Sequence, residues 1–419
     1  MKIGMLVKDL DVSGGYHKLI LRLSQQLLEM GHKVIIYTLS VDREKCYPDI
    51  INLFDIVALG SGKAVSPSGP VVKQKLKVIA LGRRPLIKSF QRLSRSMDDD
   101  LDALIIHDSV SLYALACYQS RSRDFKAVWM LNNQLPEGFG SLKAQLVNHF
   151  GAVNGFKSLA GKLVAMPALL YENQVLRKGL GRVDVVAAYD QFNRDFIKNH
   201  LKKPAVTVYA GADLEEFARL YETRPNSQHK TLRVLSVGVL FPYRRYEDLI
   251  KATALLSKSG HNIKTTIVGL HRFSISYYED LERLTKKLAI ESRVDFIEYL
   301  SDTEMQDLYQ NSDVFVFIND ALTWGISVFE AVAAGLPVVI TNNIGAADLI
   351  EHQQHGWQVP PRQPAAVADA IKEIISDRKH AETVARSAFD HITPIVSWRA
   401  YAERMIALLE GSLKVDSSD

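Results

Sequence analysis

The sequence predicts two α/β domains, each built on a parallel β-sheet that helices cover. Three observations support this fold class. At 419 residues the chain exceeds the length at which a single hydrophobic core stops growing. Short apolar runs alternate with amphipathic helical stretches along the chain, as they do in parallel sheets. The polar segment 223–230 interrupts this alternation, which then starts again, so it is interpreted as a linker.

The first half opens with a βαβ unit. Apolar runs at 2–7 and 34–38 predict two strands. Between them, Leu19, Leu23 and Leu27 fall on one face of a helix expected over 17–30. Further strands of this half are expected at 103–107, 127–131, 183–188 and 206–209.

The second half repeats the pattern of a nucleotide-binding type of sheet. Strands are expected at 233–237, 264–268, 294–298, 314–318 and 338–341, and helices at 246–258, 277–289 and 397–413. Ligands of such sheets bind beyond the carboxyl ends of the strands. Because the pattern restarts after the polar segment, we expect a first domain over 1–222, the linker 223–230, and a second domain over 231–393.

Composition favours a cytoplasmic protein. Hydrophobic residues make up 47% and charged residues 23% of the chain, as in ordinary globular proteins. Cys46 and Cys117 stand far apart without a partner motif, which suits a reducing compartment and argues against a zinc site. The chain begins with a strand pattern rather than a signal peptide, and no apolar run reaches the roughly 18 residues that a membrane span needs.

Basic residues are concentrated in two stretches. Residues 71–97 contain eight lysines and arginines and no acidic residue, and residues 139–182 mix basic with apolar side chains. Both stretches suit helices that lie on an anionic membrane surface, and equally well a solvated basic face. Nucleic acid is not an expected partner, because no motif that reads bases accompanies the charge.

Residues 319–341 contain the most informative motif, which joins a loop, a helix and a buried strand around Glu330. Gly325 and Ser327 open the helix, whose first backbone N–H groups have no partner within it. Such a helix start attracts phosphate. The alternative interpretation is a solvated glutamate that the helix dipole favours.

This motif resembles the nucleotide-sugar signature of the retaining glycosyltransferases of family 4. The resemblance implies the GT-B fold, in which two Rossmann-like domains with parallel sheets face each other across a cleft. It also implies that Gly325, Ile326, Ser327 and Glu330 bind the nucleotide half of the donor, with both Glu330 oxygens on the ribose hydroxyls.

The family signature has two glutamates eight positions apart, and here Leu322 takes the place of the first. In relatives that glutamate binds hydroxyls of the donor hexose. Leu322 and its neighbour Trp324 suggest a 6-deoxy or otherwise less hydroxylated sugar, although Asp320 offers a substitute carboxylate.

A Gly14-Gly15 pair lies between the first strand and the first helix, where glycine permits a tight turn and a close approach of ligand. It is not the Gly-x-Gly-x-x-Gly fingerprint, which argues against a dehydrogenase. Alone, such a turn is more often purely structural. The resemblance implies that this loop faces the donor phosphates and the acceptor.

His107 ends an apolar strand and is followed by Asp108. By itself a histidine here is more often structural. The resemblance implies a position beside the transferred sugar, where His107 binds a hydroxyl or stabilises positive charge at the anomeric carbon, rather than acting as a general base.

Gly238 ends the first strand of the second domain, and Arg244 and Arg245 follow it. Two guanidinium groups there would grip a diphosphate bidentately. In the family pattern Arg244 occupies the position of a lysine, while Val239 replaces an arginine. The segment 295–302 resembles the part that flanks the nucleotide base, so Tyr299 is a further donor-binding candidate.

These residues predict a retaining glycosyltransferase with His107 and Arg244 as catalytic residues. It would move a hexosyl or deoxyhexosyl group from a nucleotide-diphosphate sugar to a lipid-linked or polysaccharide acceptor in cell-surface glycan synthesis, without metal or other cofactor. The resemblance also implies that a last helix, from about residue 394 to 419, packs back on the first domain. Two alternatives stay open: a non-catalytic nucleotide-sugar-binding or scaffold protein, and a GT-B epimerase or phosphorylase.

Overall fold

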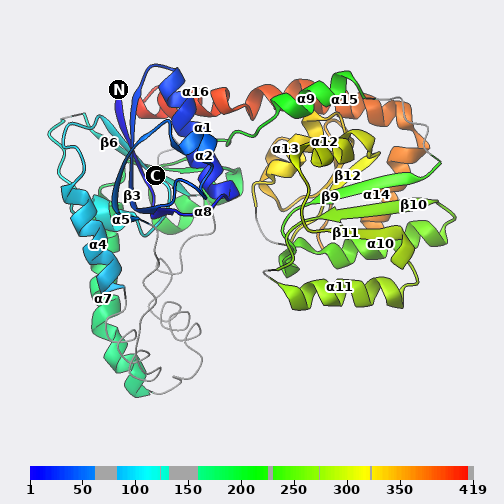
Figure 1. The fold of residues 1–419 in the computed structure, drawn as a ribbon, viewed down its shortest axis with the longest axis horizontal. Coiled ribbons are helices and arrows are strands. Elements are labelled where there is room, and N and C mark those ends of the chain that lie inside the picture. Colours follow the sequence, from blue (N-terminus) through cyan, green and yellow to red (C-terminus); the bar gives the residue numbers. More distant parts are fainter. Residues whose placement is uncertain are drawn as a thin grey trace. The chain divides into compact units, whose positions relative to one another are not determined.

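The computed structural model describes residues 1–61, 83–122, 124–131, 159–224, 230–272, 274–320 and 323–413 (Figure 1). The chain divides into two compact units. The first comprises residues 1–208 together with 402–419, and the second comprises residues 209–401. The prediction of two α/β domains with parallel sheets is confirmed.

The division between the units comes earlier in the chain than residue 222. Helix α9 (Glu215–Glu222) packs within the second unit on α12 (Asp302–Asn311) and α13 (Ile326–Ala333). Phe217 of α9 meets the Tyr309 ring edge-on at 4.9 Å between centroids. The sequence predicted that the first domain ends at residue 222, because the polar segment 223–230 follows α9. That boundary is wrong, since α9 packs on helices of the second unit.

In the first unit every strand pairing is parallel, in the order β2-β3-β1-β5-β6-β7-β8, with β4 beside β3. The central strands are buried on both faces, as helix-covered parallel strands are. The strands are β1 (Lys2–Leu6), β2 (Asp9–Leu10), β3 (Lys33–Val41), β4 (Asp55–Ser61), β5 (Ala103–Ile106), β6 (Lys126–Leu131), β7 (Val185–Ala188) and β8 (Ala205–Thr207). The helices are α1 (Gly15–Glu29), α2 (Pro48–Ile51), α4 (Arg84–Arg95), α5 (Leu112–Leu115), α7 (Leu159–Gly181) and α8 (Gln191–Leu201).

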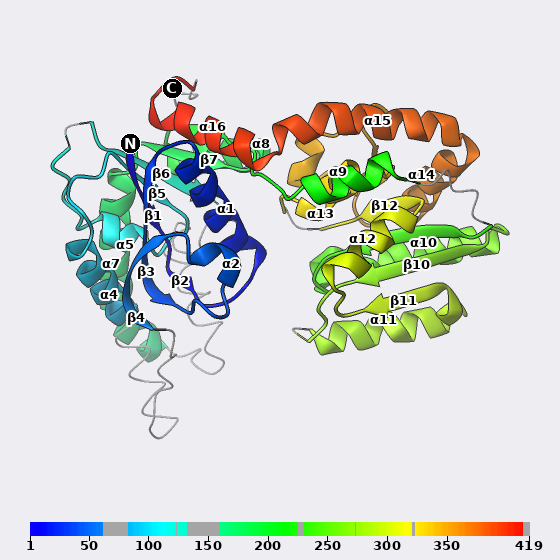
Figure 2. The same cartoon turned by 45° about the horizontal axis from the view of Figure 1, so that its top comes forward.

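The second unit holds a six-stranded parallel sheet in the order β11-β10-β9-β12-β13-β14. Figure 2 labels β10, β11 and β12 of this sheet. Its strands are β9 (Leu232–Val237), β10 (Ile263–Val268), β11 (Val294–Ile297), β12 (Val314–Phe317), β13 (Val338–Thr341) and β14 (Trp357–Val359). Besides α9, α12 and α13, its helices are α10 (Tyr246–Lys258), α11 (Ile275–Lys287), α14 (Pro364–Ser376) and α15 (Arg378–Ile395), and short 3₁₀ turns stand at η2 (Pro242–Arg244), η3 (Glu291–Arg293) and η4 (Gly345–Asp348).

The last helix, α16 (Trp398–Leu409), begins in the second unit, and the chain from Ala402 onward groups with the first. Just before it, the two segments that leave and enter the second unit pair with each other. Ala212 N donates to Val396 O at 2.8 Å, and the Trp398 indole donates to Asp213 Oδ1 at 2.6 Å.

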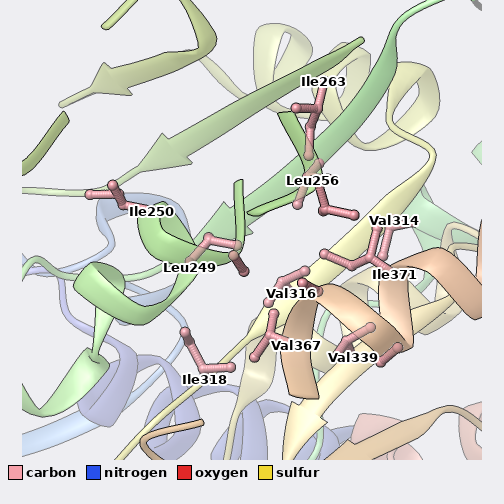
Figure 3. Packing of buried hydrophobic residues seen from close by; sticks show 14 of the residues in the cluster. Leu249, Ile250, Leu256, Ile263, Val314, Val316, Ile318, Val339, Val367 and Ile371 are labelled. Atoms are coloured by element: carbon pink, nitrogen blue, oxygen red, sulfur yellow. The ribbon is translucent and has the colours of Figure 1, made fainter. Parts of the chain in front are cut away.

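Figure 3 shows how the core of the second unit forms between its sheet and its helices. Leu249 and Ile250 come from α10, and Val367 and Ile371 from α14, and all four are buried. Helices α10 and α14 pack against each other as well as on the strands. Among the described residues, no helix is long and apolar enough to cross a lipid bilayer.

Candidate functional site

Helix α13 begins at the carboxyl edge of the second sheet. Gly325, just before it, has a left-handed backbone with φ 85°, which glycine adopts without a steric penalty. One residue into the helix, Ser327 Oγ donates to the carbonyl of Val237, the last residue of β9, at 3.1 Å. Ile326 lies half-buried between them. The helix start is therefore fixed against the end of a central strand.

Glu330 lies within α13 and is half-buried. The hydroxyl of Tyr309 donates a hydrogen bond to Glu330 Oε2 at 3.0 Å. Tyr309 is fully buried, and sequence reasoning did not select it. The alternative of a solvated first-turn glutamate does not describe this environment.

Arg244 lies beside the end of β9. Its Cζ is 4.5 Å from the ring centroid of Phe317, the last residue of β12, and 5.6 Å from that of Tyr243. A Cβ on Gly238 would come within 3.3 Å of Arg244 Cζ, so glycine lets the guanidinium approach the strand end. Arg244 Nε and Nη1 are buried and have no hydrogen-bond partner in the described part of the chain. Such donors carry a desolvation cost that an anionic ligand would offset.

Arg245 stands in different surroundings from Arg244. Its backbone is left-handed, with φ 52°, just before α10. Its Nη1 lies 2.7 Å from Glu247 Oε1, and its Nε 2.9 Å from Asp248 Oδ2. The sequence suggested that both arginines grip one ligand, but the charge of Arg245 is already balanced by two carboxylates.

The loop after β12 holds the position in which the family has its first glutamate. Leu322 lies outside the described residues. The carboxylate of Asp320 is ion-paired with Arg362, whose Nε lies 3.0 Å from Asp320 Oδ1, and this contact lowers the Asp320 pKa. Trp324 is buried and stacks on Tyr209 with centroids 5.6 Å apart. Asp320 would have to leave Arg362 to replace the missing glutamate.

Two further polar residues, Asn319 and Tyr299, follow strands of the second sheet. Asn319 directly follows the apolar run of β12, is fully buried, and donates through Nδ2 to Thr323 Oγ1 at 2.7 Å. A polar residue after a buried strand is a signal that would have found it. Tyr299 follows the edge strand β11, two places from β9 in the sheet, and is 81% exposed. The role of Tyr299 in donor binding stays a prediction.

In the first unit, His107 follows β5 and is 1% exposed. Burial lowers the pKa of His107 to about 3, so its imidazole is neutral at neutral pH. Asp108, next to it, accepts hydrogen bonds from Lys8 N at 2.7 Å, from Ser111 N at 2.8 Å and from the Tyr16 hydroxyl at 3.3 Å. Burial raises the pKa of Asp108. This carboxyl group joins the segment after β1 and the start of α1 to the loop after β5.

The Gly14-Gly15 pair does not form the tight turn that the sequence suggested. Gly14 precedes α1 with φ −149°, an extended conformation that any residue adopts. A Cβ at Gly14 would meet His17 Nδ1 at 3.4 Å, and one at Gly15 would have no described atom within 4 Å. Among the described residues, packing and backbone strain therefore do not require glycine at either position, and the role of the pair in ligand binding stays a prediction.

Two family models match the chain. The model Glycosyltransferase Family 4 matches residues 13–216, and the model Glycosyl transferases group 1 matches residues 219–391. The chain belongs to the family 4 glycosyltransferases with the GT-B fold. The resemblance stated from the sequence is confirmed at this level, whereas the reading of Leu322 stays a prediction.

Relatives and solved structures agree with this family. A protein of Methanocaldococcus jannaschii described as an uncharacterized glycosyltransferase is 29% identical over 173 residues, or 41% of this chain and 43% of that protein. The GDP-mannose-dependent alpha-(1-6)-phosphatidylinositol monomannoside mannosyltransferase of Mycobacterium tuberculosis is 24% identical over 302 residues, or 69% of this chain and 76% of that protein. The capsular polysaccharide biosynthesis glycosyltransferase CapM of Staphylococcus aureus is 26% identical over 212 residues, or 48% of this chain and 54% of that protein.

Among solved structures, Anabaena HepE in complex with UDP superposes with a TM-score of 0.69 at 16% identity, covering 98% of this chain and 100% of that one. WaaG, a glycosyltransferase involved in lipopolysaccharide biosynthesis, gives a TM-score of 0.60 at 16% identity, with coverages of 98% and 100%. At this identity the likeness shows the fold alone. The chain spans less than half of the M. jannaschii relative and about half of CapM.

Proposed function

We propose that this protein is a retaining glycosyltransferase that moves a hexosyl or deoxyhexosyl group from a nucleotide-diphosphate sugar to a lipid-linked or polysaccharide acceptor. The observation that carries the proposal is the surroundings of half-buried Arg244 beside the end of β9, since its buried Nε and Nη1 have no acceptor among the residues that the structure describes. Capsule and lipopolysaccharide synthesis, named for CapM and WaaG, support cell-surface glycan as the product class.

In this proposal Arg244 and the first N–H groups of α13 bind the diphosphate. Their positive charge stabilises the leaving group as the glycosyl C1–O bond to phosphate breaks. The acceptor oxygen forms the new bond to C1 on the same face, and its proton passes to a phosphate oxygen. We propose that no metal ion takes part, since guanidinium and helix start supply the charge.

The other site residues have separate tasks. Glu330 binds the ribose hydroxyls, and the Gly14-Gly15 backbone is a further candidate for donor binding. Neutral His107 is suited to hydrogen bonding with a sugar hydroxyl. With a pKa of about 3 it is unsuited to act as a general acid or base at neutral pH.

A donor screen tests this function. The purified protein is incubated in chelator with UDP-, GDP-, ADP- and dTDP-sugars, while thermal stabilisation and release of nucleotide are followed, with Glu330→Ala as control. We expect one donor class to stabilise the protein and to be slowly hydrolysed, with both effects lost in Glu330→Ala. Once an acceptor is found, NMR of the product should show the donor's anomeric configuration retained.

Other outcomes of this screen favour the alternatives. Binding without turnover, with every acceptor tested, supports a nucleotide-sugar-binding scaffold. Phosphate-dependent cleavage of a glycoside supports a phosphorylase, and an epimerised sugar without acceptor supports an epimerase. Dependence of turnover on an added divalent cation contradicts the metal-free mechanism.

The donor sugar is proposed to be a 6-deoxyhexose or another sugar with few hydroxyl groups. Leu322 supports this because a leucine side chain offers only apolar contact where relatives carry a glutamate. With the nucleotide held constant, a 6-deoxy donor should then have the higher kcat/KM. A fully hydroxylated hexose as the best donor would contradict this part of the proposal.

We also propose peripheral contact with an anionic membrane, at the inner face of the cytoplasmic membrane, through the basic stretches 71–97 and 139–182. Helices α4 and α7, which lie side by side in Figures 1 and 2, hold their described parts. Lys88, Arg92 and Arg95 are spaced along one exposed face of α4, and Arg177 and Lys178 are exposed on α7. The remainder of both stretches, including Lys73, Lys75, Lys77, Lys143 and Lys157, lies outside the described residues.

Other cations of these stretches have structural partners. Arg83 is ion-paired with Glu172 at 3.3 Å, and Arg182 donates to the carbonyl of Leu115 at 3.0 Å. The triple change of Lys88, Arg92 and Arg95 to Gln should therefore reduce flotation with phosphatidylglycerol vesicles. Changing Arg283, Lys286 and Lys287 of α11 to Gln removes the same charge from the second unit and should leave flotation unchanged. Equal losses in both variants would contradict a specific surface.

A further inference from the structure

Tyr309 is held rigidly within the second unit. It lies near the end of α12 and is fully buried. Its ring stacks on Phe315 of β12, with centroids 5.7 Å apart and planes 17° apart, and it meets Phe217 of α9 edge-on at 4.9 Å. Aromatic pairs in these arrangements stabilise beyond their buried area. A strand and two helices therefore fix the ring, and with it the position of the hydroxyl.

The Tyr309 hydroxyl is directed at α13. It donates to Glu330 Oε2 at 3.0 Å, and the carbonyl oxygen of Ser327 lies 3.5 Å away. Burial, together with the nearby charge of Glu330, raises the pKa of Tyr309 well above its usual value. The hydroxyl therefore keeps its proton over the physiological range and acts as the donor.

A hydrogen-bond donor at Glu330 would order its side chain before a ligand binds. A glutamate side chain has three rotatable bonds, and ordering it costs conformational entropy at the moment a ligand binds. A hydrogen bond to a carboxylate is stronger than one between neutral groups and fixes its direction. A carboxylate that is oriented before the ligand arrives avoids part of that cost.

We infer that Tyr309 is a positioning residue that orients the Glu330 carboxylate for the ribose hydroxyls of the nucleotide. The inference rests on the proposed ribose-binding role of Glu330. Because its ring and hydroxyl are buried, Tyr309 acts through Glu330 and does not touch the ligand. The support of the ribose site then extends to α9, through the contact between Phe217 and Tyr309.

The variant Tyr309→Phe tests the inference, because it keeps the ring and removes only the hydroxyl. The probes are UDP, GDP and ADP and their 2′,3′-dideoxy forms, titrated calorimetrically into the full-length protein. Loss of a hydrogen bond to a charged group should weaken ribonucleotide binding roughly 5- to 20-fold. Binding of the dideoxy form should change less than about twofold, because it lacks the groups that Glu330 binds.

A matched control separates this effect from general loss of a buried hydroxyl. In the first unit Tyr113 is also fully buried and donates to a glutamate, Glu172, at 2.9 Å. Tyr113→Phe should lower the unfolding temperature to a similar degree as Tyr309→Phe and leave nucleotide affinity unchanged. A structural role alone for Tyr309 would weaken ribose and dideoxy forms equally.

The results separate a failure of the positioning role of Tyr309 from a failure of the proposed ribose-binding role of Glu330. If Glu330→Gln weakens the ribonucleotide and Tyr309→Phe does not, the positioning role is wrong while the role of Glu330 stands. Equal weakening of both nucleotide forms by Tyr309→Phe also overturns the inference. If Glu330→Gln has no effect, or no nucleotide binds the wild type, the proposed role of Glu330 fails and the inference fails with it.

Discussion

The carboxyl edges of the two sheets share the same arrangement of parallel strands and helices, but they carry different side chains. In the first unit the loop after β5 presents His107, which burial keeps neutral, and Asp108, whose pKa burial raises. In the second unit the corresponding edge holds the guanidinium of Arg244 and the carboxylate of Glu330. The same βαβ architecture thus carries a neutral imidazole at one edge, and a guanidinium and a carboxylate at the other. Fold alone would not have separated them.

At the carboxyl edge of the second sheet, the adjacent residues Arg244 and Arg245 also differ from each other. Among the described residues, carboxylates lie within salt-bridge distance of Arg245 and not of Arg244. The charge of Arg245, which two carboxylates already neutralise, should contribute little to the binding of an anionic ligand. The buried Nε and Nη1 of Arg244, which have no acceptor among the described residues, should contribute more. The predictions below test both contrasts.

The largest effect should separate the two arginines in turnover. Arg244→Gln should lower kcat/KM roughly 100- to 1000-fold, the loss seen when one group that stabilises developing charge is removed. Arg245→Gln should lower it less than about fivefold, because Arg245 is engaged by Glu247 and Asp248. Steady-state kinetics with the donor from the screen measures both. Comparable losses would erase the distinction between these neighbours.

The next effect concerns Gly269 at the carboxyl edge of the second sheet. A Cβ on Gly269, after β10, would lie 1.9 Å from the carbonyl oxygen of Gly238. Gly269→Ala should therefore cost roughly 2–3 kcal/mol in the free energy of unfolding, by overpacking and backbone displacement. Urea denaturation measures this cost. A stability close to that of the wild type would show that the end of β9 is not confined in this way.

The third effect is a pH dependence from His107. Its pKa is about 3 when folded, below the usual 6.5, so the unfolded state binds more protons between these values. The stability it contributes is complete above pH 6.5 and is lost as pH falls, by roughly 1.4 kcal/mol per pH unit. His107→Gln should flatten the stability curve between pH 6.5 and 4 in urea denaturation. Parallel curves for both proteins would contradict a buried neutral imidazole.

The smallest effect on stability is expected at Gly15. Its Cβ position is open, so Gly15→Ala should change the free energy of unfolding by less than about 1 kcal/mol, in the stabilising direction if the helix propensity of alanine dominates. The same change should reduce turnover if a ligand approaches this backbone. Unchanged kinetics would leave the Gly14-Gly15 pair without a functional reason.

Strands were the most predictable part of the fold. The runs at 103–107 and 314–318 are apolar because they are buried on both faces, and β5 and β12 follow them closely. Helix α9 was assigned to the wrong unit, because a polar loop is visible in composition and a packing partner is not. The two-residue strand β2 left no run long enough to recognise, whereas β4 contains the apolar run 56–59 and was missed.

The site was predictable where chemistry depends on position along a strand and unpredictable where it depends on packing. Gly238, Arg244 and Glu330 follow from their places at strand ends and helix starts. The difference between Arg244 and Arg245 arises from the left-handed backbone of Arg245 and from its two ion pairs. Neither feature could be predicted from the local sequence. Tyr309 is 21 residues from Glu330 in sequence and meets it only because α12 and α13 pack together.

Calorimetric titration in chelator of nucleoside diphosphates and monophosphates tests the phosphate site most directly. Wild type and Arg245→Gln should prefer the diphosphate strongly, whereas Arg244→Gln should lose most of this preference while still binding the nucleoside through Glu330. A preference that survives in Arg244→Gln and disappears in Arg245→Gln would contradict the assignment of the phosphate site to the buried guanidinium of Arg244.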